Sequence, residues 1–255
     1  EPCEGFAIQT LIEEEGIQPD YVILGEPSNL QVRLGHRGRL EMKVTVQGRA
    51  AHASTPDLGS NAIHNAARII FGLELLAPRL AVDPFLGQGT LAVTEIDSQA
   101  ASRNAVPDCC TFYVDRRLTL GETERKALAE IQNIIDTEEL DAQVDVTEYL
   151  ATSHSGYECR ARNYFPAWVM PEDHPLVQTT VRTVRETLGY RPRLGRWGFS
   201  TDGTYTAGVA NIPTVGFGPG EERYAHTQEE QIRLNDVVDA ARVYARLAVE
   251  LLGRR

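Results

Sequence analysis

The feature that most constrains the fold is a repeated change of hydrophobic period in the middle of the chain. RLEMKVTVQG (39–48) alternates apolar and polar residues, which is typical of a half-buried strand. NAIHNAARIIFGLELL (61–76) instead has apolar residues at helical spacing and stops before Pro78. The predicted order is strand 39–48, helix 61–76, strand 89–99, strand 109–118, helix 122–136 and strand 142–150. This β-α-β-β-α-β order indicates a ferredoxin-like domain.

The segments on either side of this domain are typical of an α/β layer. GFAIQTLIEEEG is an amphipathic helix that closes on Gly16, and DYVILGEPS is a short apolar strand that leads into a polar loop. After residue 153 we expect a helix that ends at Gly189, a buried strand in IPTVGFGPG and a long amphipathic helix from residue 229. The predicted fold class is α/β, with the ferredoxin-like domain (37–153) inserted between two pieces of an α/β domain (1–36 and 154–255). These two pieces hold too few strands for a complete sheet.

Composition excludes several classes of function. The formal net charge of -11 argues against a nucleic-acid-binding surface. No apolar run approaches the roughly 18 residues of a membrane span. The four cysteines form no Cys-x-x-Cys pair, which favours a reducing, cytoplasmic location. The chain opens on EPCEG without an initiator methionine or a signal peptide, so we expect a processed or incomplete chain.

Three polar residues stand at transitions between predicted elements. Glu26 follows a strand in GEPSN, His52 lies in a small-residue loop before a helix, and His226 follows a glycine-rich loop. Each residue alone is more often structural than functional. Together, imidazole nitrogens and carboxylate oxygens are the donors that zinc takes, and ligands from distant segments converge at the carboxyl ends of strands. We expect His36 and His154 in hinge or solvent positions.

Five motifs carry a resemblance that covers essentially the whole chain. In order they are GEPSN, GRAAHASTPDLGSNAI, NAVPDCCTFYVDRR, FSTDGTYTA and AHTQEEQIRL. The sequence resembles the M20 family of metallopeptidases and deacylases, which includes acetylornithine deacetylase, succinyl-diaminopimelate desuccinylase and carboxypeptidase G2. YFPAWVMPEDHPLV and FGPGEERYAHTQEE are most similar to its YgeY-like subgroup of selenium-metabolism hydrolases.

The resemblance implies a catalytic α/β domain with two zinc ions, or cobalt in their place, and an inserted ferredoxin-like lid that forms a homodimer. Glu26 resembles a ligand of one zinc, and Glu1 and His226 resemble ligands of the other. His52 resembles the catalytic lid histidine that reaches a partner subunit's active site. Residues that resemble substrate-binding positions are Asn104, Arg117, Thr201, Gly203 and Thr204. In related lids, edge strands and the first helix pair across a two-fold axis, so RLEMKVTV and NAIHNAARII are the candidates for the dimer contact.

The family's His-x-Asp motif and its general base are absent, and both would lie upstream of residue 1. The chain is therefore expected to be the C-terminal portion of a longer enzyme and to be inactive alone. For the intact enzyme the resemblance implies amide hydrolysis by a zinc-activated water, with an N-acyl amino acid or a dipeptide as substrate. The alternative is a non-catalytic module that binds a small molecule or only dimerises. A plain structural α/β protein would require the ordered motifs to arise by chance.

Overall fold

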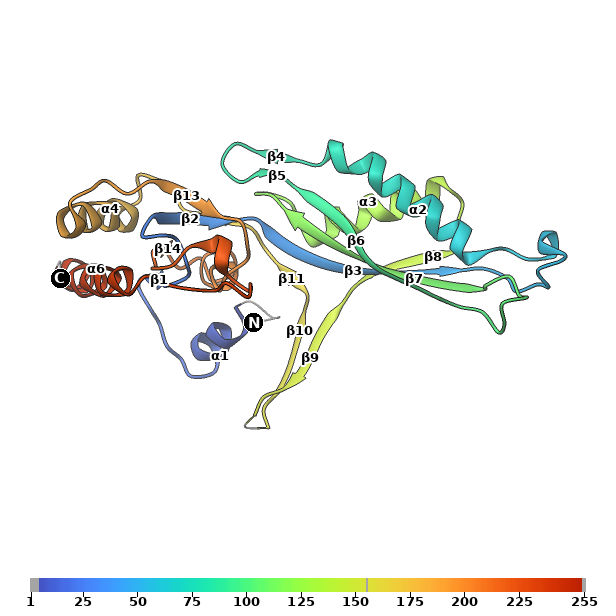
Figure 1. Cartoon of the computed structure of the whole chain (residues 1–255), viewed down its shortest axis with the longest axis horizontal. Helices are drawn as coiled ribbons and strands as arrows, with labels where there is room; N and C mark the ends of the chain where they lie inside the picture. The colour runs from blue at the N-terminus through green and yellow to red at the C-terminus, as the bar shows by residue number, and fades with distance from the viewer. Residues whose placement is uncertain (1–4, 155, 254–255) are drawn as a thin grey trace. The chain divides into compact units, whose positions relative to one another are not determined.

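The computed structural model describes residues 5–154 and 156–253. The chain divides into two compact units (Figure 1). We call residues 5–38 and 165–253 the α/β unit, and Arg39–Tyr164 the lid unit. The α/β fold with an inserted ferredoxin-like domain, predicted from the sequence, is confirmed.

The lid unit is built on a five-stranded sheet. Its strands are β3 (Gly38–Gln47), β6 (Thr90–Gln99), β7 (Cys109–Leu118), β8 (Ala142–Val146) and β11 (Tyr164–Phe165). The order is β11-β3-β7-β6, and β8 also pairs with β3 in antiparallel register. Among the described strands, β3 has neighbours along both edges, so RLEMKVTV does not offer the free edge that a dimer contact would need. That prediction was wrong, because hydrophobic alternation reports burial of one face and says nothing about the order of strands.

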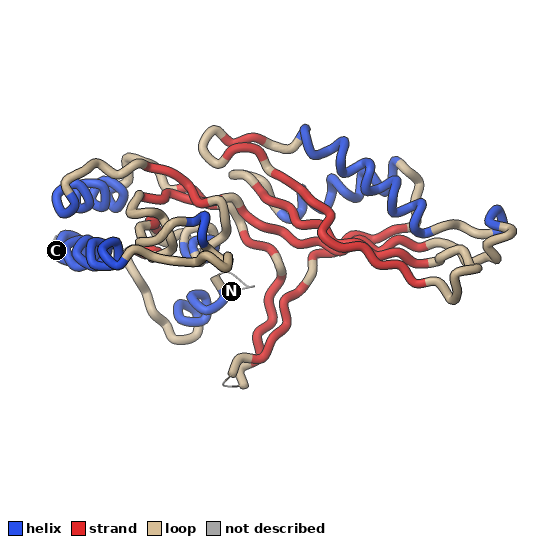
Figure 2. Tube along the Cα trace, in the orientation of Figure 1, coloured by secondary structure: helices blue, strands red, loops and turns tan. Residues whose placement is uncertain are grey.

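Two helices, α2 (Ala62–Leu76) and α3 (Glu124–Thr137), cover one face of this sheet (Figure 2). Alternate residues of β3 and β7, among them Leu40, Met42 and Phe112, point into a core shared with Ile69 and Ile131 of the helices. The opposite face of the sheet carries the polar residues of the same strands. The helices begin where the sequence predicts, because Asn61 and Thr123 accept hydrogen bonds from the first free backbone N–H groups. Two short 3-10 turns, η1 (Pro56–Leu58) and η2 (Ala77–Arg79), and the small β4–β5 hairpin (Val82–Asp83 and Gly87–Gln88) complete the connections.

The last predicted strand of the lid, 142–150, is interrupted at Thr147. The chain continues as β9 (Glu148–Thr152), which pairs with β10 (Glu158–Arg162) in a separate two-stranded hairpin. The pairing partner changes at Thr147: its N–H still donates to Glu41 O at 3.0 Å in the register of β3 and β8, whereas its carbonyl accepts from Asn163 N at 2.9 Å in the register of β9 and β10. This hairpin belongs to the lid unit, which therefore extends to Tyr164.

The α/β unit contains a mixed five-stranded sheet in the order β1-β14-β2-β12, with β13 also paired to β2. The strands are β1 (Val22–Leu24), β2 (Val32–His36), β12 (Trp168–Val169), β13 (Leu194–Trp197) and β14 (Thr214–Gly216). β1 runs parallel to β14 and lies at one end of this order. Only β1 and β14 were predicted. The other strands were missed because β12 has only two residues, and β2 and β13 are interrupted by Gly35 and Gly195.

Helices α4 (Pro175–Leu188) and α6 (Leu234–Leu252) lie side by side on this sheet. α4 begins at its cap residue His174 and ends at Gly189, which has φ +79, as predicted. α6 begins at Leu234 and not at residue 229, because Arg233 is extended and residues before it form turns. The remaining helical segments are α1 (Phe6–Glu13), the single turn α5 (Gly203–Thr206) and η3 (Glu222–Tyr224). No helix within the described ranges is both long and apolar enough to cross a membrane.

Candidate active site

The loop after β1 contains Glu26. It is hydrogen-bonded to, and closely packed against, the glycine loop after β14. The buried Ser28 hydroxyl donates to Gln31 O at 2.6 Å and accepts from Gly218 N at 2.9 Å. A Cβ at Gly218 would lie only 2.3 Å from Gly25 O and 2.4 Å from Glu26 O. Only glycine permits this approach, so Gly218 fixes the backbone that presents Glu26.

The segment that carries His226 is tied to the segment that follows Glu26 on both sides. Before His226, Glu222 forms an ion pair with Arg33 of β2 at 2.9 Å. After it, Arg233 donates to Asn29 Oδ1 at 2.5 Å. These contacts link the stretch containing Glu26 to the stretch containing His226 within the α/β unit.

Backbone strain is concentrated in these two stretches. Asn29, Leu30 and His226 have φ values of +53, +56 and +60. The left-handed region is disfavoured for residues with a Cβ, by about 1–2 kcal/mol each, and leucine has no side-chain group that offsets this. Such strain persists only where the surroundings impose it, and it is common at functional sites.

Glu26 and His226 have the donor atoms that zinc takes, but two protein ligands are fewer than a zinc site needs. Among the described residues, no group of three or more histidine, cysteine, aspartate or glutamate side chains could hold a metal ion. The third predicted ligand, Glu1, lies outside the described residues. Gly5, the first described residue, donates its N–H to Asp202 Oδ1 at 2.8 Å and so links the start of α1 to the start of α5.

The loop with Thr201, Gly203 and Thr204 is held by contacts inside the α/β unit. Thr201 and Thr204 are buried, and the Thr204 hydroxyl donates to Pro166 O at 3.0 Å. A Cβ at Gly203 would lie 2.4 Å from the ring of Trp168. Both the threonine side chains and the backbone N–H groups of these three residues are already engaged within the protein.

His36 holds the same loop; of the two expected positions, hinge or solvent, the solvent position is wrong. It is fully buried, its Nε2 accepts from Thr201 N at 3.0 Å, and its ring lies edge-on to Trp168. Because a backbone N–H can only donate, Nε2 is the acceptor, and Nδ1 donates to Arg37 O at 2.8 Å. Little in the sequence indicates this role, because His36 is the last residue of β2, a strand that was not predicted.

In the lid unit, the structure brings His52 and Asn104 together. Ala53 N donates to Asn104 O at 2.7 Å, Val106 N donates to Ala51 O at 2.8 Å, and His52 pairs with Ala105 in a β-bridge. Both side chains are exposed. Ser54 N donates to His52 Nδ1 at 3.2 Å, so in the neutral imidazole the proton is on Nε2.

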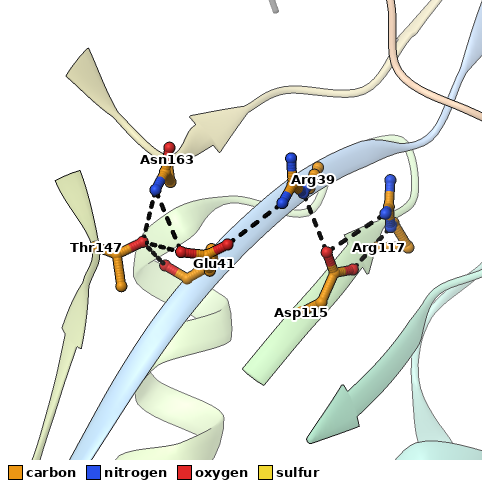
Figure 3. A network of polar contacts seen from close by, with 6 residues as sticks. All are labelled: Arg39, Glu41, Asp115, Arg117, Thr147 and Asn163. Carbon is orange, nitrogen blue, oxygen red and sulfur yellow. Dashed lines mark hydrogen bonds and ion pairs between the residues drawn. The ribbon is translucent and has the colours of Figure 1, made fainter. Parts of the chain in front are cut away.

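Arg117 is not part of that cluster. β7 has 10 residues and spans roughly 30 Å at about 3.3 Å per residue. Asn104 precedes its first residue, whereas Arg117 is next to its last. Arg117 is also engaged already, because its Nε and Nη2 donate to the two oxygens of Asp115 at 2.8 and 3.3 Å (Figure 3). One lid therefore does not present His52 and Arg117 to the same small molecule.

A separate apolar groove of about 510 Å³ follows the outer edge of β1 and the C-terminal half of α6. Its lining includes Ile23, Tyr244, Leu247 and Leu251. None of the predicted site residues lines it. A parallel strand is normally covered on its faces and paired at its edges, so this groove marks the incomplete side of the sheet.

Comparison with known proteins finds relatives of both units. Residues 34–143 match the M20 peptidase dimerisation domain. YgeY of Escherichia coli K12 is 40% identical over 253 residues, which is 99% of this chain and 63% of YgeY. The chain is thus similar to members of the M20 family over nearly its whole length. Succinyl-diaminopimelate desuccinylase 2 of Shewanella loihica is 26% identical over 250 residues, 94% of this chain and 62% of that enzyme.

Solved structures share the fold of this chain. The aminopeptidase PepT from Bacillus cereus has a TM-score of 0.71 at 19% identity and covers 95% of this chain and 60% of its own. The M20 metallo-carboxypeptidase Sso-CP2 from Sulfolobus solfataricus has a TM-score of 0.67 at 15% identity, over 94% of this chain and 66% of its own. The chain thus spans less than two thirds of the length of these relatives.

Proposed function

We propose that this chain is part of a metal-dependent hydrolase of amide bonds that acts on N-acyl amino acids or dipeptides. The observation that carries the proposal is the pairing of His52 with Asn104 in an M20 lid. The hydrogen-bonded loops of Glu26 and His226 in the α/β unit support it. The relatives include a succinyl-diaminopimelate desuccinylase and an aminopeptidase, so deacylation and peptide hydrolysis are the two forms of this chemistry.

His52 has the geometry of a hydrogen-bond donor to a developing oxyanion. Its Nδ1 is occupied by Ser54, so Nε2–H is directed away from its own loop. Such a donor strengthens its contact as charge builds on the carbonyl oxygen of the substrate. Glu26, His226 and Glu1 are the proposed metal ligands. The metal would lower the pKa of a bound water and polarise the carbonyl.

The separation of His52 from Arg117 favours a homodimer in which two lids contribute to one substrate site. The lid carries exposed apolar side chains on α2, Phe71 and Leu75, which are 61% and 51% exposed. α2 remains the candidate dimer helix. β6, at the end of the sheet order, is the candidate edge strand.

The test is a hydrolysis screen of N-acyl amino acids and dipeptides with the full-length protein loaded with zinc or cobalt. His52→Ala should lower kcat by about 10²–10³-fold, as for loss of an oxyanion donor, while metal content is unchanged. His154→Ala, which removes another exposed lid histidine, is the matched control and should retain activity. Wild-type activity in His52→Ala would refute the proposed role.

The second candidate is a non-catalytic dimerisation module. The match of residues 34–143 to a dimerisation domain favours it. A dimer by sedimentation analysis, with no turnover of any substrate by the metal-loaded full-length protein, would decide for this candidate.

A further inference from the structure

Four charged side chains of alternating sign form a row of ion pairs, here called the file, across the face of the lid sheet that the helices do not cover (Figure 3). The file runs from Glu41 and Arg39 on β3 to Asp115 and Arg117 on β7. Arg39 Nη2 lies 3.3 Å from Glu41 Oε2, and Arg39 Nε lies 3.0 Å from Asp115 Oδ2. Asp115 Oδ1 then accepts from Arg117 Nε at 2.8 Å. The four side chains are between 19% and 31% exposed, so each of them is partly buried.

One end of the file is anchored. Glu41 Oε1 accepts from the Thr147 hydroxyl at 2.7 Å and from Asn163 Nδ2 at 3.3 Å. Asn163 Nδ2 also donates to Thr147 Oγ1 at 2.8 Å. Thr147 and Asn163 stand at the root of the β9–β10 hairpin, where the backbone is fixed by hydrogen bonds to Glu41. Glu41 therefore has a defined position, and through it Arg39 has one too.

The other end of the file is a cation. Among the described residues, Asp115 is the only hydrogen-bond or ion-pair partner of the Arg117 side chain. The residue opposite Arg117 on β6 is the neutral Thr90. Asp115 occupies the Nε–Nη2 edge, so the Nη1–Nη2 edge of the guanidinium is the one left to meet a ligand. Because the file alternates acidic and basic side chains and ends on a guanidinium, an anion is the ligand that would bind there.

We propose that Asp115 and Arg39 are positioning residues that fix the guanidinium of Arg117, so that its Nη1–Nη2 edge receives the carboxylate of the substrate. This inference rests on the proposed amide hydrolase. It differs from a bidentate contact through the Nε edge, because that edge is held by Asp115. Orientation outweighs the partial neutralisation by Asp115. Without this carboxylate the like charges of Arg39 and Arg117 would face each other and drive Arg117 out of place.

The experiment compares an N-acyl amino acid with its carboxamide in the full-length, metal-loaded protein. Asp115→Ala should raise KM for the carboxylate at least about tenfold, as expected for loss of an oriented hydrogen bond to a charged group. Its kcat, and its kcat/KM for the carboxamide, should be unchanged. Arg39→Ala should shift KM in the same direction by a smaller factor. Asp115→Asn keeps one acceptor oxygen and should recover part of the affinity, and it also serves if the alanine variant folds poorly.

Asp145→Ala is the matched control, because it removes another carboxylate from the neighbouring strand β8 and should leave both substrates unaffected. An unchanged KM in Asp115→Ala would overturn the positioning role while leaving the hydrolase intact. So would an equal loss on carboxylate and carboxamide, which a general structural defect would give. If the wild-type protein hydrolyses neither substrate, the proposed function fails, and the positioning role fails with it.

Discussion

The left-handed backbone of His226 yields a prediction about stability that is independent of catalysis. His226 has φ +60 and an exposed side chain. Replacing it by alanine or by glycine removes the imidazole in both cases, so any contact of the ring cancels when the two variants are compared. What remains is the cost of holding a residue with a Cβ at a positive φ.

The magnitude follows from two opposing effects. A residue with a Cβ in this region costs about 1–2 kcal/mol, whereas glycine adopts it freely. Glycine also makes the unfolded chain more flexible, which costs about 0.4–1 kcal/mol relative to alanine. Because the backbone strain exceeds this entropic cost, His226→Gly should be more stable than His226→Ala by about 1 kcal/mol.

Urea unfolding followed by circular dichroism and by tryptophan fluorescence measures this difference. Both tryptophans, Trp168 and Trp197, are in the α/β unit, so fluorescence reports the unit that contains His226. With an m-value of about 2–3 kcal/mol/M, the midpoints should differ by roughly 0.3–0.5 M.

Glu229 provides the matched control, because it is exposed in the same loop and is not among the described residues with positive φ. There the order should reverse, with Glu229→Ala more stable than Glu229→Gly. Equal midpoints for the two His226 variants, or a more stable alanine variant, would refute the claim that this backbone is strained.

Two further predictions concern the packing around the candidate site. Burial, together with a hydrogen bond to the Glu13 carboxylate, raises the pKa of Tyr205 to about 12. Between pH 10 and 12 the unfolded state would lose this proton and the folded state would keep it, so the wild type should lose about 2 kcal/mol of stability relative to Tyr205→Phe across that window. Parallel pH-dependent curves in urea unfolding would contradict this. Gly203→Ala should destabilise by about 1–3 kcal/mol, because its Cβ would collide with Trp168, whereas Gly198→Ala, whose Cβ has its nearest neighbour at 3.8 Å, should be neutral in thermal unfolding.

The elements that the sequence predicted well are those whose signals are local. Helices α2, α3 and α4 have periodic apolar faces and their own start and stop residues, Asn61, Thr123, His174 and Gly189. These residues act within one turn of the helix, so no knowledge of the rest of the chain is needed. The short strands β2, β12 and β13 could not be found in this way, because their existence depends on pairing between segments far apart in sequence.

The residues of the candidate site also divide into those with a local signal in the sequence and those whose role depends on contacts between distant segments. Glu26, His52 and His226 are recognisable because they interrupt the pattern at element boundaries. Arg39 and Asp115 are not, because a charged residue on the polar face of a strand is what solvent exposure alone would favour. Their relation exists only once β3 and β7 are neighbours in a particular register, so no periodicity in either strand could reveal it.

Residues that contradict local preference are therefore the more informative part of this structure. Leucine has no intrinsic reason to adopt a positive φ, yet Leu30 does, and its N–H donates to Gly218 O at 3.0 Å. Gly218 in turn allows a backbone approach that any side chain would prevent. The Leu30 side chain is buried, which offsets part of this backbone cost, but the close approach at Gly218 adds no buried side chain. The strain is accounted for if the loop must hold Glu26 and His226 in fixed positions, which is what a metal-dependent hydrolase would require of them.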